Sequence, residues 1–269
     1  MRTPLLLSFV LGAALLPAQE REFGKPVATT LTELRAEPEA YRNVKIEFTI
    51  QFASLGKLTN PFFTRFTPTD FVNFYGWADE QEIWQQPAYN DLFGMLFYNK
   101  LNPQLEEVYQ LRTYDRIKVT GIVRSVFQDS PWIEVLEFTR LGGKLDTAVL
   151  THLYRGEQLM AQRQWQRAVA ELALAPGSDV PPAAQRKVHR NLGVCYLRMG
   201  EAAQAIDHLT AASNMSSETD LEMERLLAIA ATQPALELDR TVDVKSLKDH
   251  ERPMWEAFED TRAAKLTGR

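Results

Sequence analysis

The chain contains a single cysteine among its 269 residues. One thiol cannot form an internal disulfide, so the fold has to be held together by its apolar core. Cys195 lies between Val194 and Tyr196 in a segment that we expect to be helical. We therefore expect it to be a small buried apolar residue and not a redox or catalytic group.

Motifs that mark the common catalytic sites are also missing. The four histidines (His152, His189, His208 and His250) belong to no H-E-x-x-H pattern, and there is no C-x-x-C. No G-x-S-x-G nucleophile turn occurs, and the Leu-Gly-Gly-Lys sequence at 141–144 falls far short of a phosphate-binding loop. We expect no catalytic residue, no metal and no cofactor, and we expect that the protein is not an enzyme.

The net charge is small. The 35 acidic and 30 basic residues give a formal charge of −5. Non-specific binding to nucleic acid or to an anionic membrane requires a basic face, so this mild acidity argues against both. We do not expect nucleic acid to be a partner.

Long apolar runs are confined to the N-terminus. Arg2 is followed by an apolar stretch at 5–16, which has about the right length for a signal peptide and is too short to span a bilayer. Small Ala18 precedes the expected cleavage point and a polar run follows it, although a buried N-terminal helix is an alternative. We expect a periplasmic or secreted protein with no membrane span after cleavage, with a signal peptide at 1–18 and a linker at 19–30.

Alternation of apolar and polar residues predicts a β-rich first half. Residues 44–52 and 117–123 alternate with period two, which is typical of strands with one buried face. The apolar run at 93–98 predicts a central strand. Residues 103–109 begin with proline and have the pattern of a short amphipathic helix. Further strand or ribbon segments are expected at 62–66, 71–77 and 132–138.

This order of strands, a helix and two more strands resembles the OB-fold, a five-stranded barrel whose helix lies between strands three and four. Residues 31–41 resemble the lead-in helix of exported OB domains, and residues 114–121 resemble their fourth strand. Gly121 would permit the sharp coiling of a small barrel. The resemblance implies an OB-like barrel over 31–143, while another small barrel or an α+β sandwich would produce similar patterns.

Aromatic residues are frequent where OB barrels bind oligonucleotides or sugars. Phe66, Phe74 and Trp77 are the candidate barrel-face contacts in this region. Stacking on nucleobases also needs cations along the backbone track, and the only basic residue between 58 and 99 is Arg65. Core and loop packing is therefore the main expectation for these aromatics, with a protein-contact patch or a stacking platform as alternatives.

A pattern of glycine, alanine and large apolar residues appears twice in the second half. One copy includes Gly193, Ala205 and Leu209, and a more degraded copy includes Gly156 and Leu172. The pattern resembles the tetratricopeptide repeat, in which small residues lie where two antiparallel helices touch; the glycines are 37 positions apart, against an ideal period of 34. Capping helices are expected at 219–232 and 253–266, within a helical domain over 146–269.

Together the two resemblances imply a multidomain fold class: a small all-β OB-like barrel with one helix, followed by an α-helical array of tetratricopeptide-like (TPR-like) repeats. Such arrays form concave surfaces that bind partners. Cations on this face would suit an acidic or C-terminal peptide segment, although a solvated or internally packed face is an alternative. The resemblance places these residues of the second copy there: Lys187, Arg190, Val194, Leu197 and Arg198.

We therefore expect a non-catalytic exported adaptor that uses the repeats and the barrel to contact a protein or peptide partner. Binding of an oligonucleotide or oligosaccharide by the barrel is the alternative.

Overall fold

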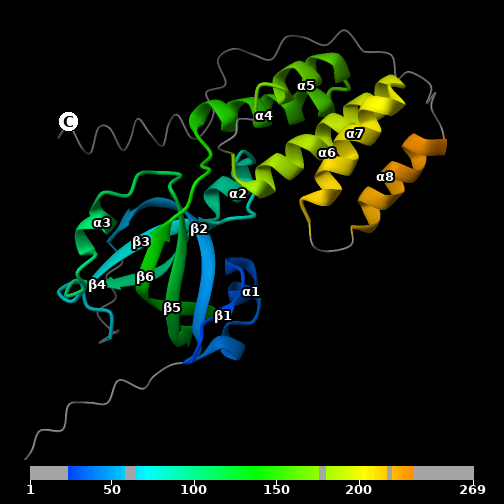
Figure 1. The fold of residues 1–269 in the computed structure, drawn as a ribbon. Coiled ribbons are helices and arrows are strands. Elements are labelled where there is room, and N and C mark those ends of the chain that lie inside the picture. The colour runs from blue at the N-terminus through cyan, green and yellow to red at the C-terminus, as the bar shows by residue number, and fades with distance from the viewer. Residues whose placement is uncertain (1–23, 58–64, 176–179, 217–219, 233–269) are drawn as a thin grey trace, which may run out of the picture.

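The computed structural model describes residues 24–57, 65–175, 180–216 and 220–232. Within them a β-barrel is followed by a group of helices, and the two parts lie side by side (Figure 1). Several expectations fall outside the described residues: the signal peptide at 1–18, the helix at 253–266 and most of the strand at 62–66.

Five strands close into a barrel. They are β2 (Lys45–Gly56), β3 (Phe71–Ala78), β4 (Phe93–Asn99), β5 (Arg116–Phe127) and β6 (Ser130–Arg140). β2 pairs antiparallel with both β3 and β5, which closes the sheet, while β4 pairs parallel with β6. A two-residue strand, β1 (Val27–Ala28), adds to β2 in parallel. The predicted strands within the described residues are confirmed.

The barrel core follows from the alternation in the strands. On β2, Ile46, Phe48 and Ile50 point inward and are at most 2% exposed, whereas the residues between them are half-buried. Gly121 lies where the pairing of β5 with β6 shifts register, and a Cβ there would lie 2.8 Å from the backbone oxygen of Glu134. The strands therefore approach each other too closely at this point for a side chain.

Short helices surround the barrel. α1 (Leu31–Ala36) begins with a capping box formed by Thr30 and Glu33, and a 3₁₀ turn at Pro38–Tyr41 follows it. α3 (Leu105–Tyr109) lies between the third and fourth barrel strands, where a helix was predicted. α2 (Gln86–Asn90) and β1 were not predicted, because elements of five and two residues are too short to show periodicity.

Within the described residues, five helices follow the barrel: α4 (Thr147–Ala161), α5 (Trp165–Leu172), α6 (Pro182–Met199), α7 (Ala202–Asn214) and α8 (Leu221–Thr232). α4 packs against α5, and α6 packs against α7. A Cβ built on Gly156 would lie 2.6 Å from the Cγ of Leu172, and one built on Gly193 would lie 2.6 Å from the Cγ of Leu209. In each of the two helix pairs, a glycine of the first helix therefore lies against a leucine of the second helix. α8 packs against α7 and matches the helix expected at 219–232.

One apolar cluster joins the barrel to the helices. Trp77, Trp84 and Tyr114 enter it from the barrel, and Leu150 and Leu153 enter it from α4; each is at most 3% exposed. Trp77 and Tyr114 stack with ring centroids 5.7 Å apart. The boundary predicted at 143–146 therefore falls beside a core that both parts share, and the two parts pack as one unit.

Candidate functional site

Two of the three cations predicted to face a partner, Lys187 and Arg190, form ion pairs within the chain. Lys187 Nζ lies 2.5 Å from Glu82 Oε1, which belongs to the segment between β3 and α2. Arg190 pairs with Glu222 of α8. Of the other three predicted contacts, Val194 is half-buried, Leu197 is buried in a cluster with residues of α7 and α8, and Arg198 is exposed at the end of α6.

These ion pairs line a small groove at the junction of the two parts. The groove has a volume of about 310 Å³ and carries three basic and four acidic side chains. Arg186 pairs with Asp220 at 2.6 Å. On its barrel side, Gln85 donates a hydrogen bond to the carboxylate of Glu157. Each of the three basic side chains of the groove is therefore paired with a carboxylate of this chain. Its charged residues are Glu80, Glu82, Asp220, Glu222, Arg186, Lys187 and Arg190.

The predicted barrel-face aromatics are buried. Phe74 and Trp77 are 1% and 0% exposed; Phe74 belongs to the barrel core and Trp77 to the junction cluster. Phe66 is 5% exposed and stacks on Phe97 with ring centroids 4.3 Å apart, and Phe97 stacks on Trp132 at 5.2 Å. The rings of this triplet cover one another on the outer side of the sheet. Phe66, Phe74 and Trp77 therefore present no open ring faces, whereas the half-buried Phe71 lines the pocket described next.

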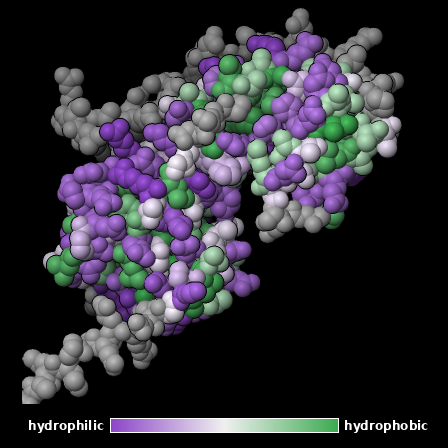
Figure 2. Space-filling model, in the orientation of Figure 1, coloured by the Kyte–Doolittle hydropathy of each residue, from purple (hydrophilic) through white to green (hydrophobic). Residues whose placement is uncertain are grey.

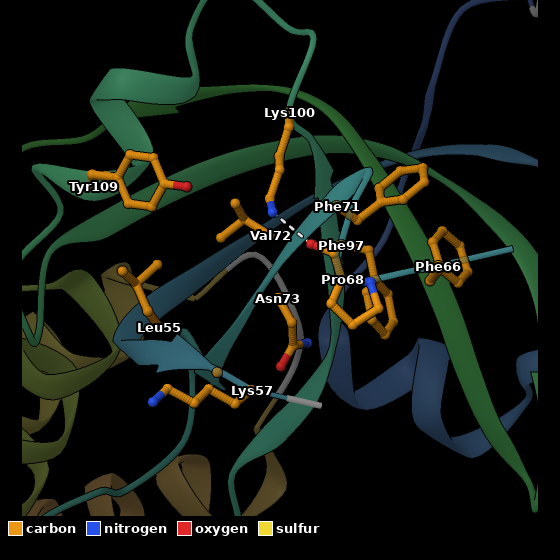
Figure 3. A pocket seen from close by; sticks show the side chains of 11 residues that line it. Leu55, Lys57, Phe66, Pro68, Phe71, Val72, Asn73, Phe97, Lys100 and Tyr109 are labelled. Atoms are coloured by element: carbon orange, nitrogen blue, oxygen red, sulfur yellow. Dashed lines mark hydrogen bonds between the residues drawn. The ribbon is translucent and has the colours of Figure 1, made fainter. Parts of the chain in front are cut away.

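Next to this triplet, a pocket of about 440 Å³ opens on the outside of the barrel (Figure 3). Three consecutive residues of β3, Phe71, Val72 and Asn73, line it, and Val72 is also part of the barrel core. Asn73 and Phe97 line the pocket, whereas their neighbours Phe74 and Leu96 belong to the barrel core. The lining comes from the end of β2, from β3, from β4 and from α3. Its residues are Leu55, Gly56, Lys57, Phe66, Pro68, Phe71, Val72, Asn73, Phe97, Lys100 and Tyr109.

Two lysines give this pocket a positive rim. Lys57 and Lys100 lie on different sides of it, with Leu55 and Val72 between them (Figure 3). None of the described residues that line the pocket is a carboxylate. The Lys100 ammonium donates to the backbone oxygen of Pro68, which fixes the direction of that side chain. The pocket thus offers an apolar floor beside two cations.

Exposed apolar side chains extend the mouth of the pocket. Leu55 is 43% exposed and Tyr109 is 46% exposed. Asn73 is buried in the floor and donates through Nδ2 to the backbone oxygens of Gly94, at 2.5 Å, and Leu96, at 3.1 Å. A Cβ on Gly56 would lie 2.0 Å from the side-chain oxygen of Asn73, so glycine leaves the space that this amide occupies.

The histidines pack between paired helices. His152 Nδ1 lies 2.9 Å from Glu171 Oε2, and His189 Nδ1 lies 3.0 Å from His208 Nδ1, with the same sequence separation of 19. The ring of Tyr196 stacks on His208 at 5.4 Å. Burial lowers the pKa of His208, and the neighbouring His189 lowers it further. Within the described ranges, no three histidine, cysteine or acidic side chains are grouped so that they could hold a metal ion. His250 lies outside those ranges.

Cys195 is completely buried, as predicted. Burial raises the pKa of its thiol to about 12. The thiol is therefore protonated at neutral pH, and protonation removes the nucleophilic form.

The sequence did not point to the rim of the barrel pocket. Lys57 follows β2, Lys100 follows β4 and Tyr109 is the last residue of α3, and no motif links them. The signal that could have drawn attention to them is that both lysines flank the aromatic segment.

None of the helices in the described part of the chain combines the length and apolarity needed to cross a bilayer. No protein-family model matches this chain, and a search of curated proteins finds no match either.

Proposed function

We propose that this protein is a non-catalytic exported adaptor, in which an OB-like barrel and a TPR-like helical module together present a surface to a protein or peptide partner. The observation that carries the proposal is the shared apolar cluster of Trp77, Trp84, Tyr114, Leu150 and Leu153. A common core fixes the two modules as one scaffold, and a fixed scaffold loses little conformational freedom when a partner binds.

The strand order supports an OB-like barrel. With the small β1 set aside, the barrel strands are arranged 1-2-3-5-4 and close back onto 1, and a helix lies between strands three and four. The contacts of Gly156 with Leu172 and of Gly193 with Leu209 support TPR-like helix pairs, because small residues at the crossing are the hallmark of that repeat.

The charges support a proposal for where the partner binds. Lys187 and Arg190 are already paired with Glu82 and Glu222, so we place the main contact at the barrel pocket and not on the inner helical face. Figure 2 shows larger hydrophobic areas over the helices than over the barrel on the face in view, so the helical module offers additional contact area.

Export and partner binding are tested together. A full-length chain with a C-terminal tag should be recovered from the periplasm or the medium of a bacterial host, shortened at its N-terminus. Crosslinking in cells followed by affinity capture should then enrich a defined protein, which is purified and titrated against the chain. A chain that stays in the cytoplasm at full length contradicts the export proposal, and a purified candidate that fails to bind contradicts the adaptor proposal.

A further inference from the structure

The barrel pocket combines positive charge with apolar surface in a chain that is acidic overall. The chain has five more acidic than basic residues, yet the described lining of this pocket contains two lysines and no carboxylate. In the groove at the junction, by contrast, the cations form ion pairs with carboxylates: Lys187 with Glu82, and Arg186 with Asp220. The pocket therefore carries a local charge that its own lining does not balance.

We propose, building on the adaptor function above, that this pocket binds a short partner segment in which a large apolar side chain is flanked by carboxylates. The apolar side chain would pack between Leu55 and Val72, and the carboxylates would bind Lys57 and Lys100. Such a segment would suit both the apolar floor and the positive rim of the pocket. Its apolar side chain would be removed from water, and its carboxylates would form charge-assisted hydrogen bonds with the lysines.

The two lysines are suited to this role in different ways. Lys100 already donates one hydrogen bond to Pro68, and an ammonium group has three donors, so it keeps the capacity to bind a carboxylate from a fixed position. Lys57 lies at the end of β2 on another side of the floor. Tyr109 directs its hydroxyl toward the same space (Figure 3) and can donate to a carboxylate or a backbone carbonyl of the segment.

A peptide fits the pocket better than a nucleic acid strand. Base stacking needs exposed ring faces and a row of cations. The neighbouring rings of Phe66, Phe97 and Trp132 stack on one another and are at most 5% exposed. The apolar side chains that remain most accessible at the pocket are Leu55 and Tyr109, and one exposed ring beside an aliphatic side chain suits an apolar amino acid side chain better than a row of stacked bases.

The test is isothermal titration calorimetry of the protein as purified from the expression host, with or without processing of its N-terminus. The first probe is the peptide acetyl-Asp-Leu-Phe-Asp-amide. A second peptide replaces both Asp residues by Asn, a third replaces Leu-Phe by Ser-Ser, and a single-stranded oligothymidylate forms the nucleic acid arm. The variant carries Lys57→Glu with Lys100→Glu. The matched control carries Lys25→Glu with Lys144→Glu, which makes the same charge change at exposed positions that do not line this pocket.

We expect the first peptide to bind with a dissociation constant below about 1 mM. The pocket variant should bind it about tenfold more weakly, because favourable ion pairs become repulsions, while the control variant should change affinity less than about twofold. The Asn and Ser peptides should each bind more weakly to the native chain. Thermal melting establishes that all variants are folded.

Three results would overturn the proposal: no binding of the first peptide up to about 1 mM, equal binding by the pocket and control variants, or displacement of the peptide by the oligonucleotide. The cellular capture experiment separates this inference from the adaptor function. If the pocket variant still captures the same purified partner with unchanged affinity, the site is wrong and the adaptor function stands. If the native chain has no partner, the adaptor function itself fails.

Discussion

Lys187 of α6 and Glu82 of the barrel form an ion pair of 2.5 Å across the junction between the two modules. The same ammonium lies 3.8 Å from Glu157 of α4, whose carboxylate also accepts a hydrogen bond of 3.1 Å from Asn191. The side chain of Glu157 is only 15% exposed, so water screens its charge less than it screens a surface carboxylate. One cation therefore connects α4, α6 and the barrel.

Removing this cation should destabilise the protein. We expect Lys187→Met to lower the free energy of unfolding by about 1–2 kcal/mol, because the poorly exposed Glu157 carboxylate loses its cation. Arg190→Met is the control, since its partner Glu222 is 63% exposed, and a change below about 0.5 kcal/mol is expected there. Urea unfolding measures the free energy of unfolding of both variants. If the two variants lose the same stability, burial of the partner carboxylate does not determine the effect of removing its cation.

A methyl group at Gly193 should disturb the contact between α6 and α7. A Cβ there would lie 2.6 Å from the Cγ of the completely buried Leu209 and 3.3 Å from the backbone oxygen of Ala205. Overpacking outweighs the helix propensity gained from alanine, so Gly193→Ala should cost about 1–2 kcal/mol. Gly24→Ala is the control, because nothing lies within 4 Å of that Cβ. Thermal melting compares them, and a stabilised Gly193→Ala variant would contradict the close contact.

Stability should fall on acidification because of His208. Its pKa in the folded protein lies below the ordinary value of 6.5, through burial and the neighbouring His189, with Asp207 opposing more weakly. The unfolded chain therefore binds the proton more readily, and folding stability decreases as the pH drops below about 6.5.

The variant His208→Gln keeps a polar partner for His189 but does not titrate. Its melting temperature should change less between pH 7.5 and pH 5.5 than that of the native protein. His152→Gln is the comparison, because it removes a histidine that lies in the first helix pair and contacts Glu171 at 2.9 Å. A native protein whose melting temperature rises on acidification over this range would refute the assignment.

Cys195 should be inert to thiol reagents while the protein is folded. Its thiol is inaccessible, and burial raises its pKa to about 12, so almost no thiolate exists at pH 8. A chromogenic disulfide reagent should therefore react only after guanidinium is added. Cys195→Ala should be tolerated better than Cys195→Ser, which places a hydroxyl in an apolar core and should cost about 1–3 kcal/mol. Rapid labelling of the native protein would contradict this burial.

The sequence predicted the local elements well because each leaves a periodic pattern. The alternation at 44–52 and the glycine-centred pattern around Gly193 correspond to β2 and to the α6–α7 pair. Relationships between distant segments leave no such pattern. The aromatic window of 58–99 contains Arg65 as its only basic residue, yet Lys57 and Lys100 lie immediately beyond its two ends, and the pairing of β2, β3 and β4 brings them to one pocket.

Contacts between distant segments also decide what the cations on the predicted helical face do. The repeat pattern places Lys187 and Arg190 together correctly on one helix. Their partners, Glu82 and Glu222, come from the barrel and from α8, and neither lies near α6 in the sequence. Whether a cation serves a partner or the chain's own fold depends on such tertiary contacts, which a helical repeat pattern does not encode.

The closure of the barrel through β2 and β5 also sets an order of events during synthesis. β2 pairs with β5, and β6 links β4 to β5, so the nascent chain cannot close the barrel until β6 has been made. The helix pairs depend on contacts between neighbouring segments, such as Gly193 with Leu209, and form rapidly once translated. From contact order we therefore expect barrel closure to be slower than formation of the helix pairs.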